Sequence, residues 1–239
     1  MEEQSNRRCL GLIGGLGVGA TIHYYQELVK LHGARGCVPN LLIVHADVDR
    51  VLRDAAAGDS HALAEYLAEP ILRLSKAGAR IAAIPSVTPH LCLDELVALS
   101  PIPLVSLPGA ILGEIQRRNL KRVALFGTRF TMETEVFGQL PGVEIVPATV
   151  EETDFIHRAY VQIVNAGRST EEHFQGLRRI AHALCEREQV EAIVLAGTEL
   201  SLVFNQANAD FPHIDGASAH LAAIMRRLFE EDGAGARKA

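Results

Sequence analysis

Two short stretches of the sequence end an apolar run in small and hydroxyl-bearing residues. Residues 82–90 read AAIPSVTPH, and residues 192–199 read AIVLAGTE. A buried parallel strand ends in this way where its carboxyl end opens into a site, and open α/β sheets bind ligands at those ends. Ser86, Thr88 and Thr198 are the hydroxyl-bearing residues at these two ends. The alternative is that both stretches are ordinary exits from strand to loop.

Histidines and a glutamate near these stretches are the candidates for proton transfer. His90 closes the first stretch, Glu199 closes the second, and His220 follows Asp215 on the final predicted helix. Histidine suits proton transfer because its pKa lies near neutrality. The alternative for both histidines is a structural role, in which the ring bridges or caps the backbone. Glu199 either orients a base or bonds a neighbouring amide.

A glycine-rich turn follows the first predicted strand. Residues 11–19 read GLIGGLGVG, and Gly14 and Gly15 stand between that strand and a predicted helix. We expect their backbone amides, at the helix N-terminus, to approach a small anion such as a carboxylate. A dinucleotide site is the weaker alternative, because the acidic residue that this motif needs is missing from its expected place and Asp47 lies well beyond it.

The remaining polar candidates are two charged residues and four thiols. Asp47 ends the second predicted strand, and Arg53 just after it could clamp a second carboxylate, although an exposed helical arginine is the ordinary alternative. The cysteines show no CxxC motif and no metal-ligand spacing, which predicts reduced thiols. We expect packing roles for Cys9 and Cys185. Cys92 lies near enough to His90 to reach a cleft, unless it sits on the next helix.

Strands and helices alternate along the chain, which is typical of a parallel sheet covered by helices on both faces. The predicted strands cover residues 10–17 (with the turn), 41–46, 81–85, 103–107, 122–128, 143–147, 192–196 and 212–215. The predicted helices cover residues 20–31, 61–77, 109–119, 155–187 with a break near 166–169, and a last segment from 217.

The sequence repeats itself at an offset of 109 positions. This offset relates several pairs of identical residues: Pro103 and Pro212, Leu112 and Leu221, Ile115 and Ile224, Arg117 and Arg226, and Arg118 and Arg227. A repeat of this size indicates paired domains. We predict domains at 10–119 and 120–230, packed so that residues 82–90 and residues 192–199 face each other across a cleft. We also predict a disordered tail at 231–239.

Composition narrows the class of partner. The 239 residues carry a net charge of −6 without a basic run, so we expect no nucleic acid partner. No apolar stretch approaches the roughly 20 residues that span a bilayer, so no membrane is expected. Residues 1–8 lead straight into a strand and do not read as a signal peptide, which predicts a cytoplasmic protein.

Taken together, the motifs resemble the aspartate/glutamate racemase superfamily. They are GLIGGL (11–16) with Thr21 and Tyr24-Tyr25, VTPH (87–90), LFGTRFTM (125–132), GTE (197–199), and Asp215 with His220. The resemblance implies an α/β fold of two pseudo-symmetric domains, each with a parallel sheet flanked by helices. It also implies an isomerase that acts on a small amino or carboxylic acid, without pyridoxal phosphate, metal or other cofactor, and a homodimer.

The resemblance also implies a set of ligand contacts. The hydroxyls around the carboxylate would come from Thr88, Thr128, Thr131 and Thr198, and the backbone amides from Gly14 and Gly15. A local alternative for Thr131 is to cap the helix that follows it. In relatives, one cysteine from each domain removes and returns the α-proton on opposite faces of the carbon.

This sequence departs from the family where that chemistry takes place. Ser86 stands where relatives carry the first cysteine of Cys-Asn-Thr, and Gly197 stands where they carry the cysteine of Gly-Cys-Thr-Glu. Ordinary two-thiol racemisation is therefore excluded unless another group has moved in. Asn165 replaces a basic residue that many relatives carry before Ala-Gly, which weakens the inference of an acidic substrate.

Three hypotheses follow from these departures. The first is an enzyme that works through a modified site, either as an isomerase or on one face only, as a lyase or decarboxylase does. In the one-face form, Gly197 would leave space for a larger substituent while Ser86 and His90 serve the other face. The second hypothesis is a non-catalytic protein that binds a small acid. The third is a nucleotide-dependent enzyme.

Overall fold

The computed structural model describes residues 8–133 and 142–229, so the tail predicted at 231–239 lies outside the described residues. The first half of the chain forms β1 (Leu10–Gly14), α1 (Val18–Gly33), β2 (Leu41–His45), α2 (Val48–Ala56), α3 (Ser60–Lys76), β3 (Ile81–Ala83), the 3₁₀-helix η1 (Thr88–Cys92), α4 (Leu93–Leu99), β4 (Leu104–Val105) and α5 (Leu107–Arg117). The second half forms β5 (Arg122–Phe126), α6 (Arg129–Glu133), β6 (Glu144–Ile145), α7 (Val150–Ala166), α8 (Glu171–Arg187), β7 (Ala192–Leu195), the 3₁₀-helix η3 (Thr198–Leu202), β8 (His213–Asp215) and α9 (Gly216–Phe229).

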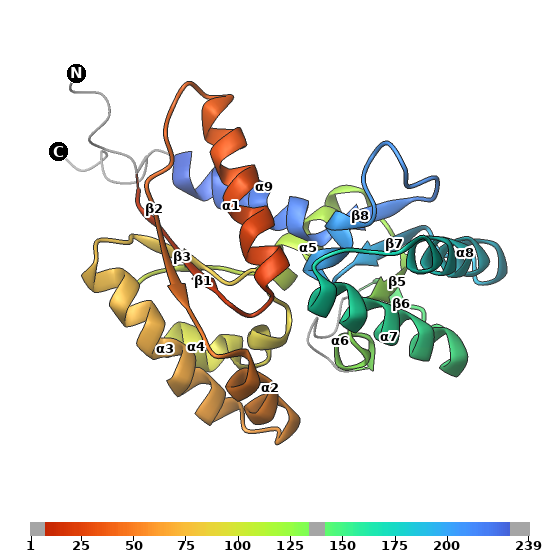
Figure 1. Ribbon diagram of the computed structural model, residues 1–239, viewed down its shortest axis with the longest axis horizontal. Helices are drawn as coiled ribbons and strands as arrows, with labels where there is room; N and C mark the ends of the chain where they lie inside the picture. Colours follow the sequence, from red (N-terminus) through yellow and green to blue (C-terminus); the bar gives the residue numbers. More distant parts are fainter. Residues whose placement is uncertain (1–7, 134–141, 230–239) are drawn as a thin grey trace.

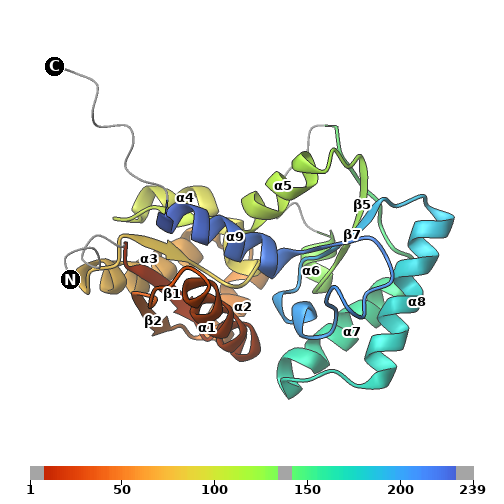
Figure 2. The same ribbon diagram turned by 90° about the horizontal axis from the view of Figure 1, so that it is seen from above.

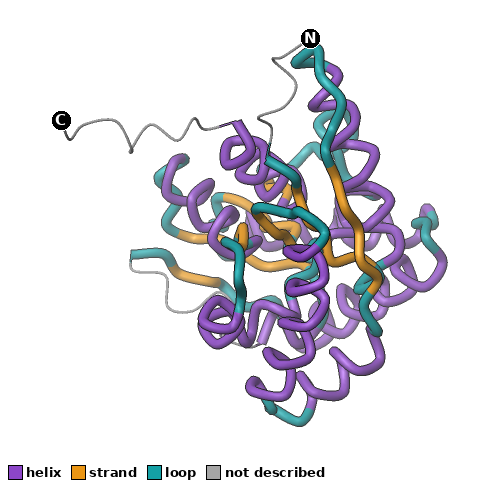
Figure 3. Tube along the Cα trace, turned by 90° about the vertical axis from the view of Figure 1, so that its left-hand side faces the viewer, coloured by secondary structure: helices purple, strands orange, loops and turns teal. Residues whose placement is uncertain are grey.

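The strands form two parallel sheets with the same internal order. One sheet runs β2-β1-β3-β4 and the other runs β6-β5-β7-β8, with every neighbouring pair parallel (Figure 1). Helices enclose the strands, as Figure 3 shows in purple around orange. The predicted α/β fold, with two pseudo-symmetric sheets flanked by helices, is confirmed. No helix within the described ranges is long and apolar enough to cross a membrane.

The last helix of each half packs on the sheet of the other half. Ile111 and Ile115 of α5 lie in one core cluster with residues of β5, β7 and β8, all in the second sheet. Leu221 and Ile224 of α9 lie in another cluster with residues of β1, β3 and α1. Figure 2 shows α9 crossing from β8 to the first sheet, while α5 lies beside β5.

This exchange bears on the predicted domains at 10–119 and 120–230, which stay a prediction. Each sequence half supplies its own strands but takes its final covering helix from the other half. The physical reason is that β4 and β8 each end at the junction between the sheets, and α5 and α9 pack against each other there. Helical periodicity identifies an apolar face but does not say which sheet that face covers.

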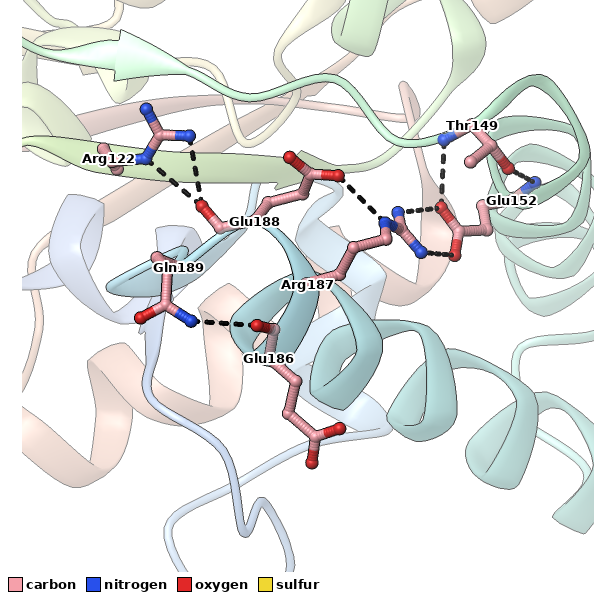
Figure 4. Close-up of polar contacts among 7 residues, drawn as sticks. All are labelled: Arg122, Thr149, Glu152, Glu186, Arg187, Glu188 and Gln189. Atoms are coloured by element: carbon pink, nitrogen blue, oxygen red, sulfur yellow. Dashed lines mark hydrogen bonds and ion pairs between the residues drawn. The ribbon is translucent and has the colours of Figure 1, made fainter.

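A polar cluster fixes the two ends of the α7–α8 pair (Figure 4). The Thr149 hydroxyl accepts the Glu152 amide, and the Glu152 carboxylate accepts the Thr149 amide, so both caps of a capping box begin α7. The Arg187 guanidinium near the end of α8 donates two bonds to Glu152, at 3.1 and 3.0 Å. These bonds hold the pKa of Glu152 below its usual range. Gly167, at φ 65°, ends α7 within the predicted break.

Candidate functional site

A cavity of about 660 Å³ lies where the carboxyl ends of β1, β3, β5 and β7 come together. Seven predicted site residues line it: Gly15, Ser86, Thr88, Thr128, Thr131, Gly197 and Glu199. Five predicted site residues are not in its lining: Gly14, Asp47, Arg53, His90 and Thr198. Because Ser86 and Gly197 line the same cavity, the two strand ends face each other as the sequence analysis expects.

The segment that follows β3 presents two hydroxyls to the cavity. Ser86 and Thr88 are both half-buried, and both line the cavity. Neither side chain hydrogen-bonds to another described residue. Their hydroxyls therefore keep their full capacity to donate to a ligand.

At the end of β7, an aromatic ring from α7 fills the space beside Gly197. A Cβ atom built on Gly197 would lie 2.7 Å from Cζ of Tyr160, closer than real Cβ contacts come. The expectation that Gly197 leaves space for a larger substituent is therefore wrong at the glycine itself. The ring of Tyr160 occupies that space because α7 packs directly over the end of β7.

Glu199 holds Tyr160 in this position. The Tyr160 hydroxyl donates to Glu199 Oε2 at 2.6 Å, and burial together with the Glu199 charge raises the pKa of Tyr160 well above its usual value. The Thr198 hydroxyl lies 3.2 Å from Glu199 Oε2 and 3.3 Å from the Pro85 carbonyl. Across the junction, the Ala20 amide near the start of α1 donates to Glu199 Oε1 at 3.4 Å. Glu199 thus ties the second half to the N-terminus of a helix in the first.

The buried His90 and His220 side chains make structural contacts. The Leu107 amide donates to His90 Nε2 at 3.2 Å, so the Nδ1–H of the neutral ring donates to the Ser86 carbonyl at 2.9 Å. Burial lowers the pKa of His90 to about 4 and that of His220 to about 3. His220 lies 2.9 Å from the Val105 carbonyl. Both ring nitrogens of His90 hydrogen-bond to the backbone, and His90 does not line the cavity. The geometry therefore favours a role in positioning Ser86, rather than the predicted direct proton transfer.

His157 is a cavity residue that the sequence analysis missed. It lies on α7, half-buried, and lines the cavity beside Tyr160. The Arg129 amide donates to His157 Nδ1 at 3.2 Å, so the proton of the neutral ring is on Nε2. Burial, followed by the nearby Arg129 charge, lowers the pKa of His157. The only sequence signal was its spacing of three and four residues from Tyr160 and Val161, which puts all three on one helix face.

The other predicted contacts have local roles. The Thr21 hydroxyl accepts the Gly15 amide at 3.1 Å, so this amide is not available to an anion. Asp47 caps α2 by accepting the Asp49 and Arg50 amides. Arg53 is exposed on that helix, as the ordinary alternative predicted. The Thr128 and Thr131 hydroxyls lie 2.9 Å apart, and Thr128 also accepts the Thr131 amide. Thr128, and not Thr131, therefore caps the start of α6.

All four cysteines are in the described ranges, and none of them lines the cavity. Cys92 is buried at the end of η1, and burial raises its pKa to about 12. A thiol that stays protonated to this degree is a poor nucleophile and a poor base. Among the residues that the structure describes, no group of three or more His, Cys, Asp or Glu side chains is arranged to hold a metal ion.

Comparison with known proteins gives consistent matches. The family described as Asp/Glu/Hydantoin racemase matches residues 13–224. The chain is 21% identical over 224 residues to the broad specificity amino-acid racemase RacX of Bacillus subtilis (strain 168), covering 87% of this chain and 93% of that protein. It is also similar to the structure of an aspartate racemase homologue from Pyrococcus horikoshii OT3, with a TM-score of 0.80, 25% identity, and coverage of 93% and 100% of the two chains. The aspartate racemase structure from Picrophilus torridus shares the fold, with a TM-score of 0.72, 18% identity, and coverage of 92% and 94%.

Proposed function

The chain belongs to the Asp/Glu/Hydantoin racemase family, and from this premise we propose that it is an enzyme that protonates a carbanion at the α-carbon of a small amino or carboxylic acid. The acid binds in the cavity between the two sheets, and the chemistry takes place on one face of the carbon. The observation that best supports this proposal is the contrast between the ends of β3 and β7. Ser86 presents a hydroxyl without a described partner, whereas the ring of Tyr160 fills the space beside Gly197.

The lining side chains are better suited to donate a proton than to remove one. The Ser86 and Thr88 hydroxyls are donors, and His157 can donate from Nε2 to a carboxylate. The buried Glu199 carboxylate is engaged by three donors of the protein. A hydroxyl with no adjacent base is a weak base at neutral pH, but it is a sufficient acid toward a carbanion.

Loss of CO₂ is the route to a carbanion that needs no base. The bond between the α-carbon and one carboxylate breaks, its electron pair stays on the α-carbon, and CO₂ leaves. The Ser86 O–H then gives its proton to that carbon, and the serine oxygen regains a proton from water. The hydroxyl of Thr88 and the ring of His157 hold the remaining carboxylate, whose oxygens carry the developing charge.

Deuterium incorporation tests this mechanism. We expect the protein in D₂O to release CO₂ from 2-substituted malonic acids and to place one deuterium on the α-carbon, giving mainly one enantiomer on chiral chromatography. Ser86→Ala should lower turnover by about 100-fold or more, with an unchanged unfolding midpoint because its hydroxyl has no described partner. Equal amounts of both enantiomers, or inversion of an amino acid with α-deuterium exchange, would contradict one-face chemistry.

A non-catalytic protein that binds a small acid is the second candidate. The observation that favours it is the replacement of both family thiols, by Ser86 and Gly197, with no other thiol in the cavity lining. Tight binding of a carboxylic acid, without CO₂ release and without α-deuterium exchange over a panel of amino acids and substituted malonic acids, would favour this candidate over the enzyme.

The family also suggests how the protein works in the cell. We propose a cytoplasmic homodimer that needs no pyridoxal phosphate, metal or other cofactor. Light scattering coupled to size-exclusion chromatography measures the oligomer directly. Turnover that is unchanged after exhaustive dialysis against a chelator and a carbonyl reagent would support the proposal of a cofactor-free enzyme.

A further inference from the structure

We infer that the ligand of this cavity carries an apolar, uncharged substituent beyond its carboxylate. This inference rests on the proposed function, which places the carboxylate of the ligand at the strand ends. It goes further by assigning a chemical class to the rest of the ligand. The evidence is the character of the two helices that line the other side of the cavity.

One face of α2 supplies an apolar wall. Five apolar residues of α2 line the cavity at helical spacing, Val48, Val51, Leu52, Ala55 and Ala56, and Asp49 is the sixth lining residue of this helix. Val51 and Ala55 are buried against the core, whereas Leu52 is 52% exposed. An exposed leucine in a concave, apolar surface gains stabilisation when a ligand covers it. The wall is therefore suited to an apolar group.

The face of α7 changes from polar to apolar along the helix. His157 and Tyr160 line the cavity first, and Val161 and Val164 line it one turn further on. Val161 is 36% exposed. The Nε2–H donor of His157 and a surface for hydrocarbon thus lie side by side on one helix, which fits a ligand with one polar and one apolar end.

The charges of the lining disfavour a second anionic group at the far end of the ligand. Among the described lining residues there is no arginine or lysine, and the two carboxylates are Asp49 and Glu199. Asn165, which also lines the cavity, is uncharged. A side-chain carboxylate, such as that of aspartate or glutamate, would lose its hydration without gaining a cationic partner.

A calorimetric binding series tests the inference without requiring turnover. The purified protein is titrated with butanoate, hexanoate and octanoate, and with succinate and adipate as dicarboxylates of matched length. We expect each buried methylene to strengthen monocarboxylate binding by up to about fourfold, until the cavity is filled. Adipate should bind more weakly than hexanoate. A flat length series, or tighter binding of adipate than of hexanoate, would overturn the inference.

Two matched leucines provide the control. Leu52 on α2 lines the cavity, whereas Leu72 on α3 is 42% exposed and does not. Leu52→Ala should weaken hexanoate binding by about threefold to tenfold, and Leu72→Ala should leave it unchanged. Leu52→Arg should reverse the preference toward adipate. Equal effects of the two alanine variants would contradict an apolar wall at α2.

The outcomes separate this inference from the proposed function. Length-dependent monocarboxylate binding by a protein that releases no CO₂ and exchanges no α-deuterium supports the apolar substituent and contradicts the enzyme. Turnover of acids with a charged substituent, combined with a flat length series, supports the enzyme and overturns the apolar substituent.

Discussion

At the residue level, the chemistry of the second strand end depends on a side chain far away in sequence. The sequence places Gly197 at the end of β7, and that placement is correct. Tyr160 could not be connected with it from the sequence, because the contact depends on how α7 lies over the sheet. The same limit applies to His157, whose position in the cavity follows from the rotation of α7. Several lining residues next to strand ends could be named from the sequence, although Gly14, Asp47 and Thr198 do not line the cavity, and the lining residues of the covering helix α7 could not be named.

The contact between Gly197 and Tyr160 can be tested by stability measurements. Gly197 has φ −72°, a backbone conformation that any residue adopts, so the cost of an added methyl is steric. We expect Gly197→Ala to lower the free energy of unfolding by about 1 to 3 kcal/mol. In urea titrations, the double variant with Tyr160→Ala should lose less than the sum of the single variants.

Gly113 is the matched control, because a Cβ atom there would meet no other atom within 4 Å. Gly113→Ala should be neutral or stabilising by up to about 1 kcal/mol. Strict additivity of Gly197→Ala and Tyr160→Ala would mean that the ring does not fill this space.

The buried His90 predicts a stability that falls in mild acid. Its pKa is about 4 in the folded protein, below the ordinary value of about 6.5. As the pH falls below about 6.5, the unfolded chain takes up a proton at His90 that the folded chain does not, so stability is complete above this pH and declines toward pH 4. We expect this residue to account for about 1 to 2 kcal/mol of the loss between pH 6.5 and 5. Urea titrations at the two pH values measure it.

His90→Gln separates this proton from the other titrating groups. The variant should be less stable at pH 7 because it loses ring hydrogen bonds, yet its stability should decline less between pH 6.5 and 5. Burial, the main cause of the low pKa of His220, about 3, acts in both proteins, whereas the smaller part that comes from the His90 charge is lost in the variant. An identical decline in both proteins would show that His90 is not held neutral.

At the level of elements, α7 brings five of the second half's residues to the cavity, between His157 and Asn165. The predicted helical region began at residue 155, whereas α7 begins at Val150 behind the capping box of Thr149 and Glu152. A Thr-x-x-Glu motif is readable in a sequence, so this start could have been predicted. The Arg187 bonds to Glu152 could not, because they join residues that the α7–α8 turn brings together.

Removing the cap of α7 should affect the site as well as stability. We expect Thr149→Ala to lower the free energy of unfolding by about 1 kcal/mol and to weaken hexanoate binding, because the first turn leads directly to His157. Thr170→Ala is the matched variant, since Thr170 caps α8 in the same way and α8 does not line the cavity. It should cost similar stability and leave binding unchanged. Equal loss of binding in both variants would argue against a specific role of α7.

At the level of the whole molecule, the repeat of two related α/β halves was predictable, and the exchange of helices was not. Identical residues at an offset of 109 indicated two related halves, and both sheets have the same strand order. The pairing of Ile115 with Ile224 correctly equated α5 with α9. Contiguous domains do not follow from that equivalence, because each helix packs on the partner sheet. The two halves are thereby interlocked around the cavity.

The same pair of isoleucines gives the test of this interlocking. Both side chains are almost fully buried, and each truncation to alanine should lower the free energy of unfolding by about 2 to 5 kcal/mol. Native-state hydrogen exchange separates them by location. Ile224→Ala should speed exchange first in β1, β3 and α1, although Ile224 belongs to the second half of the sequence, and Ile115→Ala should do so first in β5 and β7. If each variant instead loosened the sheet of its own sequence half first, the halves would be independent folding units, and the cavity would lie between two separable domains.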